Sequence, residues 1–153
     1  MRGTTAIAVV GVMGVACGSS PAAQVSASPT SSTQLVVAVE IKTVKGQQEP
    51  VLVNANAQTL YYLTSDTSTT VACSGQCVTF WPPLLLPAGD PASGSSLPGK
   101  LSVLADANGR QVLYNGHPLY AFVKDKASGD ANGEGVNAFG GTWHPATPSL
   151  AAM

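Results

Sequence analysis

The chain has 153 residues and a formal net charge of -1 at pH 7, and only 10% of its residues are charged. Soluble domains usually contain about 25% charged residues, and a nucleic-acid-binding domain also needs a basic face. We therefore expect no nucleic-acid partner. With 16 glycines and 11 prolines, the composition favours short strands joined by turns over helices.

Residues 1–16 predict a signal peptide. Arg2 gives the segment a positive charge, and from Ala6 to Ala16 only glycines interrupt the apolar side chains. This run is shorter than the roughly 20 residues that a membrane-spanning helix needs, and it is typical of the apolar region of an export signal. We therefore predict that the protein is exported and that this segment is removed.

Cys17 follows directly and is the predicted site of lipidation. Its context, Gly-Val-Ala-Cys, resembles the lipobox of bacterial lipoproteins, in which the signal is cut before a cysteine that carries a diacylglyceryl group. In this chain Gly14 stands where leucine is usual. The alternative is an ordinary secretory signal that happens to contain a cysteine. The resemblance implies a lipid anchor on the extracytoplasmic face of the bacterial cell membrane, which is the predicted membrane partner.

A tether and one folded domain are expected after this cysteine. Residues 17–34 predict a disordered tether, because they are rich in serine, alanine, proline and threonine and carry no charge. The domain is expected over residues 35–150, which is the usual size of a single domain. It begins with residues 35–44, where β-branched side chains alternate in part with polar ones and predict a strand.

Residues 49–66 predict two further strands separated by a turn at residues 54–57. In the second of these strands Tyr61 and Leu63 share one face by the strand period of two. The opposite face is also apolar, which indicates a central strand. Asp66 follows in a turn, where a short carboxylate can accept hydrogen bonds from backbone N–H groups.

Cys73 and Cys77 are the predicted disulfide, since an exported protein meets an oxidising compartment and Cys17 is assigned to the lipid. The segment between them is either a tight loop or one helical turn. The prolines after Trp81 end any helix, because a residue that precedes proline is disfavoured in the helical conformation.

The two cysteines could instead bind a metal or haem. Their spacing matches neither a structural zinc site nor the c-type haem motif. A soft-metal site would need both cysteines and both histidines, His117 and His144, to converge through folding. We therefore predict no metal and no cofactor, and we keep redox or metal handling by Cys73 and Cys77 as the alternative function.

Residues 88–99 predict a polar connector that divides the domain in two. Residues 101–125 then predict three strands with turns at residues 108–109 and 115–116. Both turns are Asn-Gly, which is a strong hairpin signal between apolar alternations because both residues tolerate positive φ.

The last predicted element is a long glycine-rich loop over residues 126–148, which returns to Trp143. Within this loop, residues 130–135 resemble a calcium loop through their alternating oxygen-bearing side chains. Gly141 stands at the twelfth position, where a calcium-binding loop needs glutamate. A solvated loop is therefore the preferred interpretation.

Two stretches of the domain resemble each other, each with an aspartate five residues after a tyrosine and a tryptophan farther on. The repeat-motif residues are Tyr61, Leu63, Asp66 and Trp81 in the first stretch and Tyr120, Phe122, Asp125 and Trp143 in the second. We predict an all-β domain of two imperfect repeats of about sixty residues, at about 50–87 and 101–148, that bury a common face against each other.

These stretches resemble the bacterial secreted-repeat lipoproteins of unknown function, a family with a Tyr-x-aromatic-x-x-Asp motif. The resemblance is carried by "TLYYLTSD", "CSGQCVTFWPPL", "QVLYNGHPLYAFVKD" and "GVNAFGGTW". The second copy fits the motif fully, whereas the first has Leu63 where an aromatic residue is expected. The resemblance implies an exported, often lipid-anchored protein, and it implies no particular activity.

No combination of nucleophile and base emerges from the sequence. Each histidine precedes a proline, and turn capping accounts for Asp66 and Asp125 separately. Acid-base catalysis by the two aspartates would require both in one cleft with shifted pKa values. We therefore expect a non-enzymatic binding or structural module with an unidentified envelope protein or cell-wall partner.

Overall fold

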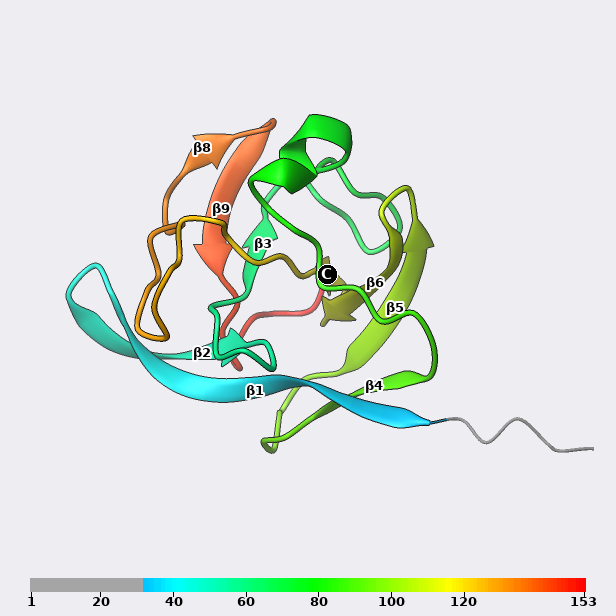
Figure 1. Ribbon diagram of the computed structural model, residues 1–153, viewed down its shortest axis with the longest axis horizontal. Helices are drawn as coiled ribbons and strands as arrows, with labels where there is room; N and C mark the ends of the chain where they lie inside the picture. Colours follow the sequence, from blue (N-terminus) through cyan, green and yellow to red (C-terminus); the bar gives the residue numbers. More distant parts are fainter. Residues whose placement is uncertain (1–31) are drawn as a thin grey trace, which may run out of the picture. The chain divides into compact units, whose positions relative to one another are not determined.

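The computed structural model describes residues 32–153 of the chain (Figure 1). The predicted signal peptide, Cys17 and the predicted tether up to residue 31 lie outside the described residues. The described part is all-β, as predicted, with one short 3-10 helix, η1, at Gly75–Thr79. The strands are β1 Thr33–Val44, β2 Gln47–Val53, β3 Tyr61–Leu63, β4 Asp90–Ser93, β5 Leu101–Asp106, β6 Gly109–Tyr114, β7 His117–Pro118, β8 Asn137–Ala138 and β9 Gly141–Pro145. Within residues 32–153 no helix is long and apolar enough to cross a membrane.

The first sheet has the order β2-β1-β4. β1 begins at Thr33, two residues before the predicted start of the domain, and pairs antiparallel with β2. The turn between them is formed by Lys45 and Gly46, whose φ angles of 46° and 82° are typical of a two-residue hairpin. On its other side β1 pairs in parallel with β4.

The second sheet has the order β3-β9-β8 and joins distant parts of the chain, because Leu63 of β3 lies opposite Trp143 of β9. On the other side of β3, Tyr61 exchanges two backbone hydrogen bonds with Tyr120, at 2.7 and 2.9 Å. β3 therefore has backbone partners on both sides, as its two apolar faces predict.

The third sheet has the order β5-β6-β7. The turn between β6 and β7 is the predicted Asn115-Gly116 turn, with φ angles of 50° and 88°. The turn between β5 and β6 is formed by Ala107 and Asn108, one residue earlier than predicted, and Gly109 already belongs to β6.

Three strands lie where the sequence predicts none. β4 lies in the predicted connector, and β8 and β9 lie in the predicted glycine-rich loop. Their sequences are short and contain glycine, proline or polar residues, so no alternation of apolar side chains marks them. β4 and β9 arise from pairing with the distant strands β1 and β3, and β8 pairs with β9.

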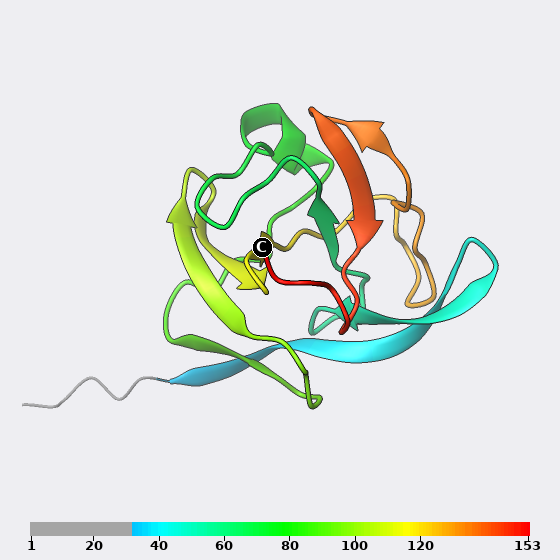
Figure 2. The same ribbon diagram turned by 180° about the vertical axis from the view of Figure 1, so that it is seen from behind.

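The two stretches predicted as repeats exchange backbone partners. β3 belongs to the first stretch, whereas its partner β9 belongs to the second. Conversely, Leu84 N of the first stretch donates to Leu119 O of the second at 2.9 Å, and Ala121 N donates to Pro82 O at 2.8 Å. Figures 1 and 2 show β3 and β9 side by side from opposite directions. The sheets thus cross the boundary between the stretches, and a repeat architecture stays a prediction.

Hydrophobic side chains form two main clusters in the interior. The first consists of Val37, Leu52, Leu60, Leu86, Val112, Tyr114, Leu119 and Ala146. The second consists of Tyr61, Leu63, Cys73, Cys77, Trp81, Tyr120, Phe122 and Trp143, and we call it the motif core. Burial of a large apolar side chain contributes about 1.5–3 kcal/mol, so both clusters are main sources of stability.

Candidate functional site

The motif core contains most of the residues that the sequence singles out. None of its side chains is more than 6% exposed, and the two motif aspartates, Asp66 and Asp125, are 4% and 3% exposed. Cys17 lies outside the described residues. In this conformation the motif tyrosines and aspartates are therefore closed to a ligand in solvent.

Each motif tyrosine donates a hydrogen bond to the aspartate of the other stretch. The Tyr61 hydroxyl lies 2.7 Å from Asp125 Oδ2, and the Tyr120 hydroxyl lies 2.8 Å from Asp66 Oδ2. Hydrogen bonds to an ionised acceptor are shorter and stronger than bonds between neutral groups. These two bonds join the stretches at corresponding motif positions.

The second carboxylate oxygen of each aspartate accepts a backbone N–H. Asp66 Oδ1 accepts from Ala72 N at 2.6 Å, and Asp125 Oδ1 accepts from Asn132 N at 2.9 Å. The sequence predicts capping of the local turn, whereas these backbone bonds reach six and seven residues ahead, and the bond to the distant tyrosine has no signal in the sequence. Since both oxygens of each carboxylate have partners, their evident role is to hold the fold.

Burial raises the pKa of both motif tyrosines. The hydrogen bond to Asp125 raises the pKa of Tyr61 further, and the charge of Asp66 does the same for Tyr120. The pKa of Asp66 is itself raised by burial, against the lowering effect of the bonds from Ala72 and Tyr120. Both phenols therefore stay protonated near neutral pH and act as hydrogen-bond donors.

The two motif tryptophans stack on each other, one from each stretch. The ring centroids of Trp81 and Trp143 are 3.8 Å apart and the ring planes differ by 3°. Phe122 stacks on Trp81 at 4.1 Å. Tyr61 and Tyr120 meet Trp81 and Trp143 edge-on at 5.4 and 5.1 Å. Such aromatic pairs add about 0.5–1.5 kcal/mol each beyond the burial of their area.

The predicted disulfide between Cys73 and Cys77 is confirmed. After Cys73 the chain is extended at Ser74, and the short helix η1 begins at Gly75 and includes Cys77, so the segment between the cysteines is part loop and part helical turn. Asn108 Nδ2 donates to Cys73 O at 2.9 Å and ties this segment to the turn between β5 and β6. Disulfide sulfurs are not thiolates, the form in which cysteine binds metals.

Residues 32–153 contain no group of three or more His, Cys, Asp or Glu side chains that could hold a metal ion. In the stretch that resembles a calcium loop, Asp130 Oδ2 accepts from Lys126 N and Ala127 N at 2.7 and 2.9 Å. These bonds lower the pKa of Asp130. The carboxylate thus serves the local turn.

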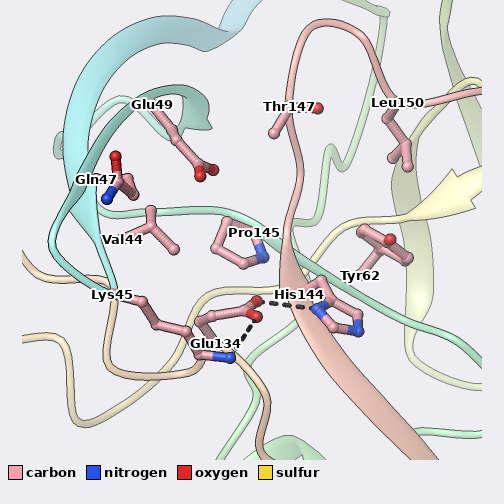
Figure 3. Close-up of a pocket in the computed structure, with 10 residues that line it drawn as sticks. All are labelled: Val44, Lys45, Gln47, Glu49, Tyr62, Glu134, His144, Pro145, Thr147 and Leu150. Atoms are coloured by element: carbon pink, nitrogen blue, oxygen red, sulfur yellow. Dashed lines mark hydrogen bonds and ion pairs between the residues drawn. The ribbon is translucent and has the colours of Figure 1, made fainter.

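A surface cleft of about 450 Å³ is lined by both charged and apolar side chains, and we call it the His144 cleft (Figure 3). Its lining residues are Val44, Lys45, Gln47, Glu49, Tyr62, Glu134, His144, Pro145, Thr147 and Leu150. The hairpin of β1 and β2 forms one wall, and β9 with the segment after it forms the other. The cleft contains cationic, anionic and neutral polar side chains together with the aromatic ring of Tyr62.

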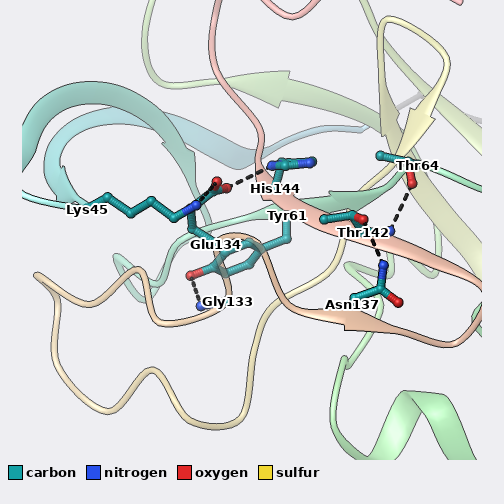
Figure 4. Close-up of polar contacts among 8 residues, drawn as sticks. All are labelled: Lys45, Tyr61, Thr64, Gly133, Glu134, Asn137, Thr142 and His144. Carbon is teal, nitrogen blue, oxygen red and sulfur yellow. Dashed lines mark hydrogen bonds and ion pairs between the residues drawn. The ribbon is translucent and has the colours of Figure 1, made fainter.

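Glu134 joins the two walls of the cleft. Its Oε1 lies 3.0 Å from Lys45 Nζ and its Oε2 lies 2.9 Å from His144 Nδ1 (Figure 4). Burial of Glu134 acts to raise its pKa, but the bonds from Lys45 and His144 prevail, and the pKa is lowered. The carboxylate is therefore ionised near neutral pH and holds the turn of the first hairpin against β9.

Tyr62 and Glu49 are the groups in the cleft that are best placed for a ligand. Tyr62 is half-buried, and its ring centroid lies 4.9 Å from that of His117 and 5.8 Å from that of His144. Burial raises the pKa of Tyr62, and the charge of Glu134 adds to this effect. Glu49 is also half-buried, and within residues 32–153 it has no ion-pair partner.

Sequence reasoning did not bring the cleft residues together. It considered His144 as a metal ligand and the stretch around Glu134 as a calcium loop, whereas the structure pairs these two side chains with each other. Lys45, Glu49 and Tyr62 come from segments that share no periodic pattern. The one signal in the sequence that points to Glu134 is the scarcity of charged residues. In a chain with so few charges, a carboxylate in a glycine-rich loop is a candidate for an ion pair.

Residues 102–147 match the model of a family described as a secreted repeat of unknown function. The matched segment begins in β5 and ends just after β9, so it contains Tyr120, Phe122, Asp125 and Trp143. This match confirms the predicted resemblance. No curated protein and no solved structure shows significant similarity to the chain.

Proposed function

We propose that this chain, whose residues 102–147 match the family of secreted repeats of unknown function, is a lipid-anchored binding module of the bacterial envelope without catalytic activity. The family description supports export. The anchor is Cys17, which follows a short apolar run and precedes a serine-rich segment without charge.

The observation that carries a non-enzymatic role is the complete engagement of the motif carboxylates. Asp66 and Asp125 are the buried acids of the domain, and each uses one oxygen for a tyrosine and the other for a backbone N–H. General acid-base catalysis needs a group within reach of the substrate. In this conformation the motif residues stabilise the fold, and a binding site would lie on the surface of the domain.

The His144 cleft is the binding site in this proposal. Glu49 can accept hydrogen bonds from a ligand, Lys45 can donate one, and Tyr62 offers an aromatic surface. Small-molecule sites commonly combine an apolar or aromatic wall with a few placed polar groups. The cleft suits a polar ligand that carries both donors and acceptors, such as an exposed group of a cell-wall polymer.

Replacement of the anchoring cysteine tests localisation. The full chain and its Cys17→Ala variant are expressed in a bacterial host, and each is followed in the membrane fraction and in the detergent-free soluble fraction. We expect the parent chain in membranes and the variant in the soluble fraction. Equal membrane association of the two chains would contradict the lipid anchor.

Retention by purified cell walls tests the binding role. The unlipidated chain from Gly18 onward is sedimented with cell walls, and Glu49→Gln is compared with Asp90→Asn, which removes one exposed carboxylate far along the chain. We expect Glu49→Gln to reduce retention about tenfold and Asp90→Asn to leave it unchanged, because a hydrogen bond to a charged group contributes about 1.5–3 kcal/mol. Absence of retention, equal effects of the two changes, or chemical turnover of the polymer would refute the proposal.

A further inference from the structure

Phe80 and Phe139 form an aromatic pair on the surface. They are 44% and 39% exposed, and their ring centroids are 6.3 Å apart. Phe80 follows η1, and Phe139 lies in the turn between β8 and β9. Figures 1 and 2 show these two elements next to each other at the same end of the domain.

A shallow depression of about 220 Å³ lies at this pair. Its lining residues are Phe80, Trp81, Phe122, Lys124, Val136, Ala138 and Phe139, and we call this surface the aromatic patch. Lys124 is its one polar member among the described residues, and its side chain is exposed. The patch is therefore apolar with a single positive charge.

Phe139 occupies a backbone position that rarely holds an aromatic residue. Its φ is +57°, and a left-handed conformation costs a residue with a side chain about 1–2 kcal/mol. The corresponding turn between β6 and β7 has the favoured Asn115, whose side chain donates to Leu150 O at 2.8 Å. The Phe139 ring pairs with Phe80, and Phe139 is 39% exposed. Backbone strain that presents an exposed aromatic ring points to a contact outside the domain.

We propose that the aromatic patch is a membrane-contact surface, in which Phe80 and Phe139 enter the interface of an anionic phospholipid layer. A sugar or a polar peptide would need several hydrogen-bonding groups around it, and the patch offers one. A lipid interface needs apolar side chains and a cation near the headgroup phosphates. Lys124 meets the second requirement.

The length of the chain before the domain supports this occupant. Fourteen residues lie between Cys17 and Ser32, and the chain from one to the other spans at most about 50 Å. The inference rests on the proposed lipid anchor in one respect, because the anchor would keep the domain close to a bilayer and raise the effective concentration of lipid. The contact itself needs no acyl chain.

Flotation with vesicles tests the inference independently of the anchor. The unlipidated chain from Gly18 onward is mixed with phosphatidylglycerol vesicles or with phosphatidylcholine vesicles. We expect binding to the anionic vesicles that weakens with salt and is lost in Lys124→Glu. Phe139→Asn should reduce binding about fivefold, since it removes an aromatic ring of which only part is exposed to the interface. Asparagine also suits the turn, so the fold is preserved.

Ile41→Thr is the matched control. Ile41 is 61% exposed on β1, and a β-branched threonine keeps the strand. This change should leave vesicle binding unaltered. The inference is overturned if the parent chain does not float with anionic vesicles, or if Ile41→Thr and Phe139→Asn weaken binding equally. It is also overturned if Phe139→Asn weakens only retention by cell walls, which would assign the patch to the wall. Failure of the anchor alone would instead appear in the fractionation of Cys17→Ala.

Discussion

The loop from Asp66 to Trp81 and the loop from Asp125 to Trp143 perform the same task by different means. Each begins with an aspartate that binds the tyrosine of the other stretch and ends with a tryptophan of the central stack. The first is closed by a covalent bond between Cys73 and Cys77. The second contains no cysteine and relies on close packing of its backbone.

Gly133 shows how the second loop is held. Its backbone N donates to the Tyr61 hydroxyl at 3.2 Å, and a Cβ at this position would lie 2.7 Å from Tyr61 Cε1 and 2.8 Å from Trp81 Cη2. The loop thus rests directly on the rings. The comparison teaches that the aspartate-tyrosine bond and the tryptophan stack are the shared requirement, whereas the closure between them can vary.

The largest expected effect comes from Gly133→Ala. The added methyl group has no room between two fixed rings, so we expect the free energy of unfolding to fall by about 3 kcal/mol in urea titrations. Gly129→Ala in the same loop is the control, because a Cβ there meets no atom within 4 Å. Equal stability of the two variants would mean that the loop does not pack on Tyr61 as described.

The double change Cys73→Ser with Cys77→Ser should have the next largest effect. Loss of a cross-link that closes so short a loop is expected to lower the free energy of unfolding by about 2 kcal/mol through chain entropy. Urea titration under non-reducing conditions measures it. A loss of less than about 0.5 kcal/mol would show that the backbone bonds to Asp66 close the first loop by themselves.

The two tyrosine-to-phenylalanine changes should differ from each other. Tyr61→Phe leaves both Asp125 Oδ2 and Gly133 N without their partner, whereas Tyr120→Phe leaves Asp66 Oδ2. We expect losses of about 1.5 and about 1 kcal/mol in the free energy of unfolding, because each buried polar group left unpaired adds to the cost. The reverse order would contradict the assignment of Gly133 as a donor.

The smallest effect should be a pH dependence from Asp66. Its pKa is raised by burial, so the folded state binds the proton more tightly than the unfolded state does. The stability that this group contributes is fully present below the unfolded value of about 3.9 and is lost as pH rises through the folded pKa. We therefore expect the free energy of unfolding of the parent chain, measured between pH 3 and pH 7, to fall relative to that of Asp66→Asn as pH rises. A difference that grows in favour of the parent chain would have the wrong sign.

The sequence predicts the elements that contain their own signal. The strand from Leu35 to Val44 has β-branched alternation, and the Asn115-Gly116 turn has the residues that positive φ requires. The disulfide between Cys73 and Cys77 is likewise predicted by the oxidising compartment and by the number of cysteines that remain after Cys17. Local pattern is sufficient where the partner of an element is its neighbour in the chain.

Prediction fails where a partner lies far along the chain. β9 has glycine, histidine and proline among its five residues and becomes a strand because it pairs with β3, some eighty residues earlier. The same reason hides the bond from Tyr61 to Asp125 and the ion pairs of Glu134. The motif residues are buried in one core because strands of the two stretches pair with each other. No local pattern in the sequence predicts this pairing.

The exchanged pairing also fixes the order in which the domain can be completed. β3 obtains its strand partner only when residues 141–145 are available, so the motif core cannot close on a partial chain. Contacts of such long sequence separation form late, because the entropy of loop closure must be overcome first. A chain that crosses a membrane through a narrow channel has to remain unfolded until it emerges. In this topology the motif core can form only after β9 has become available to pair with β3.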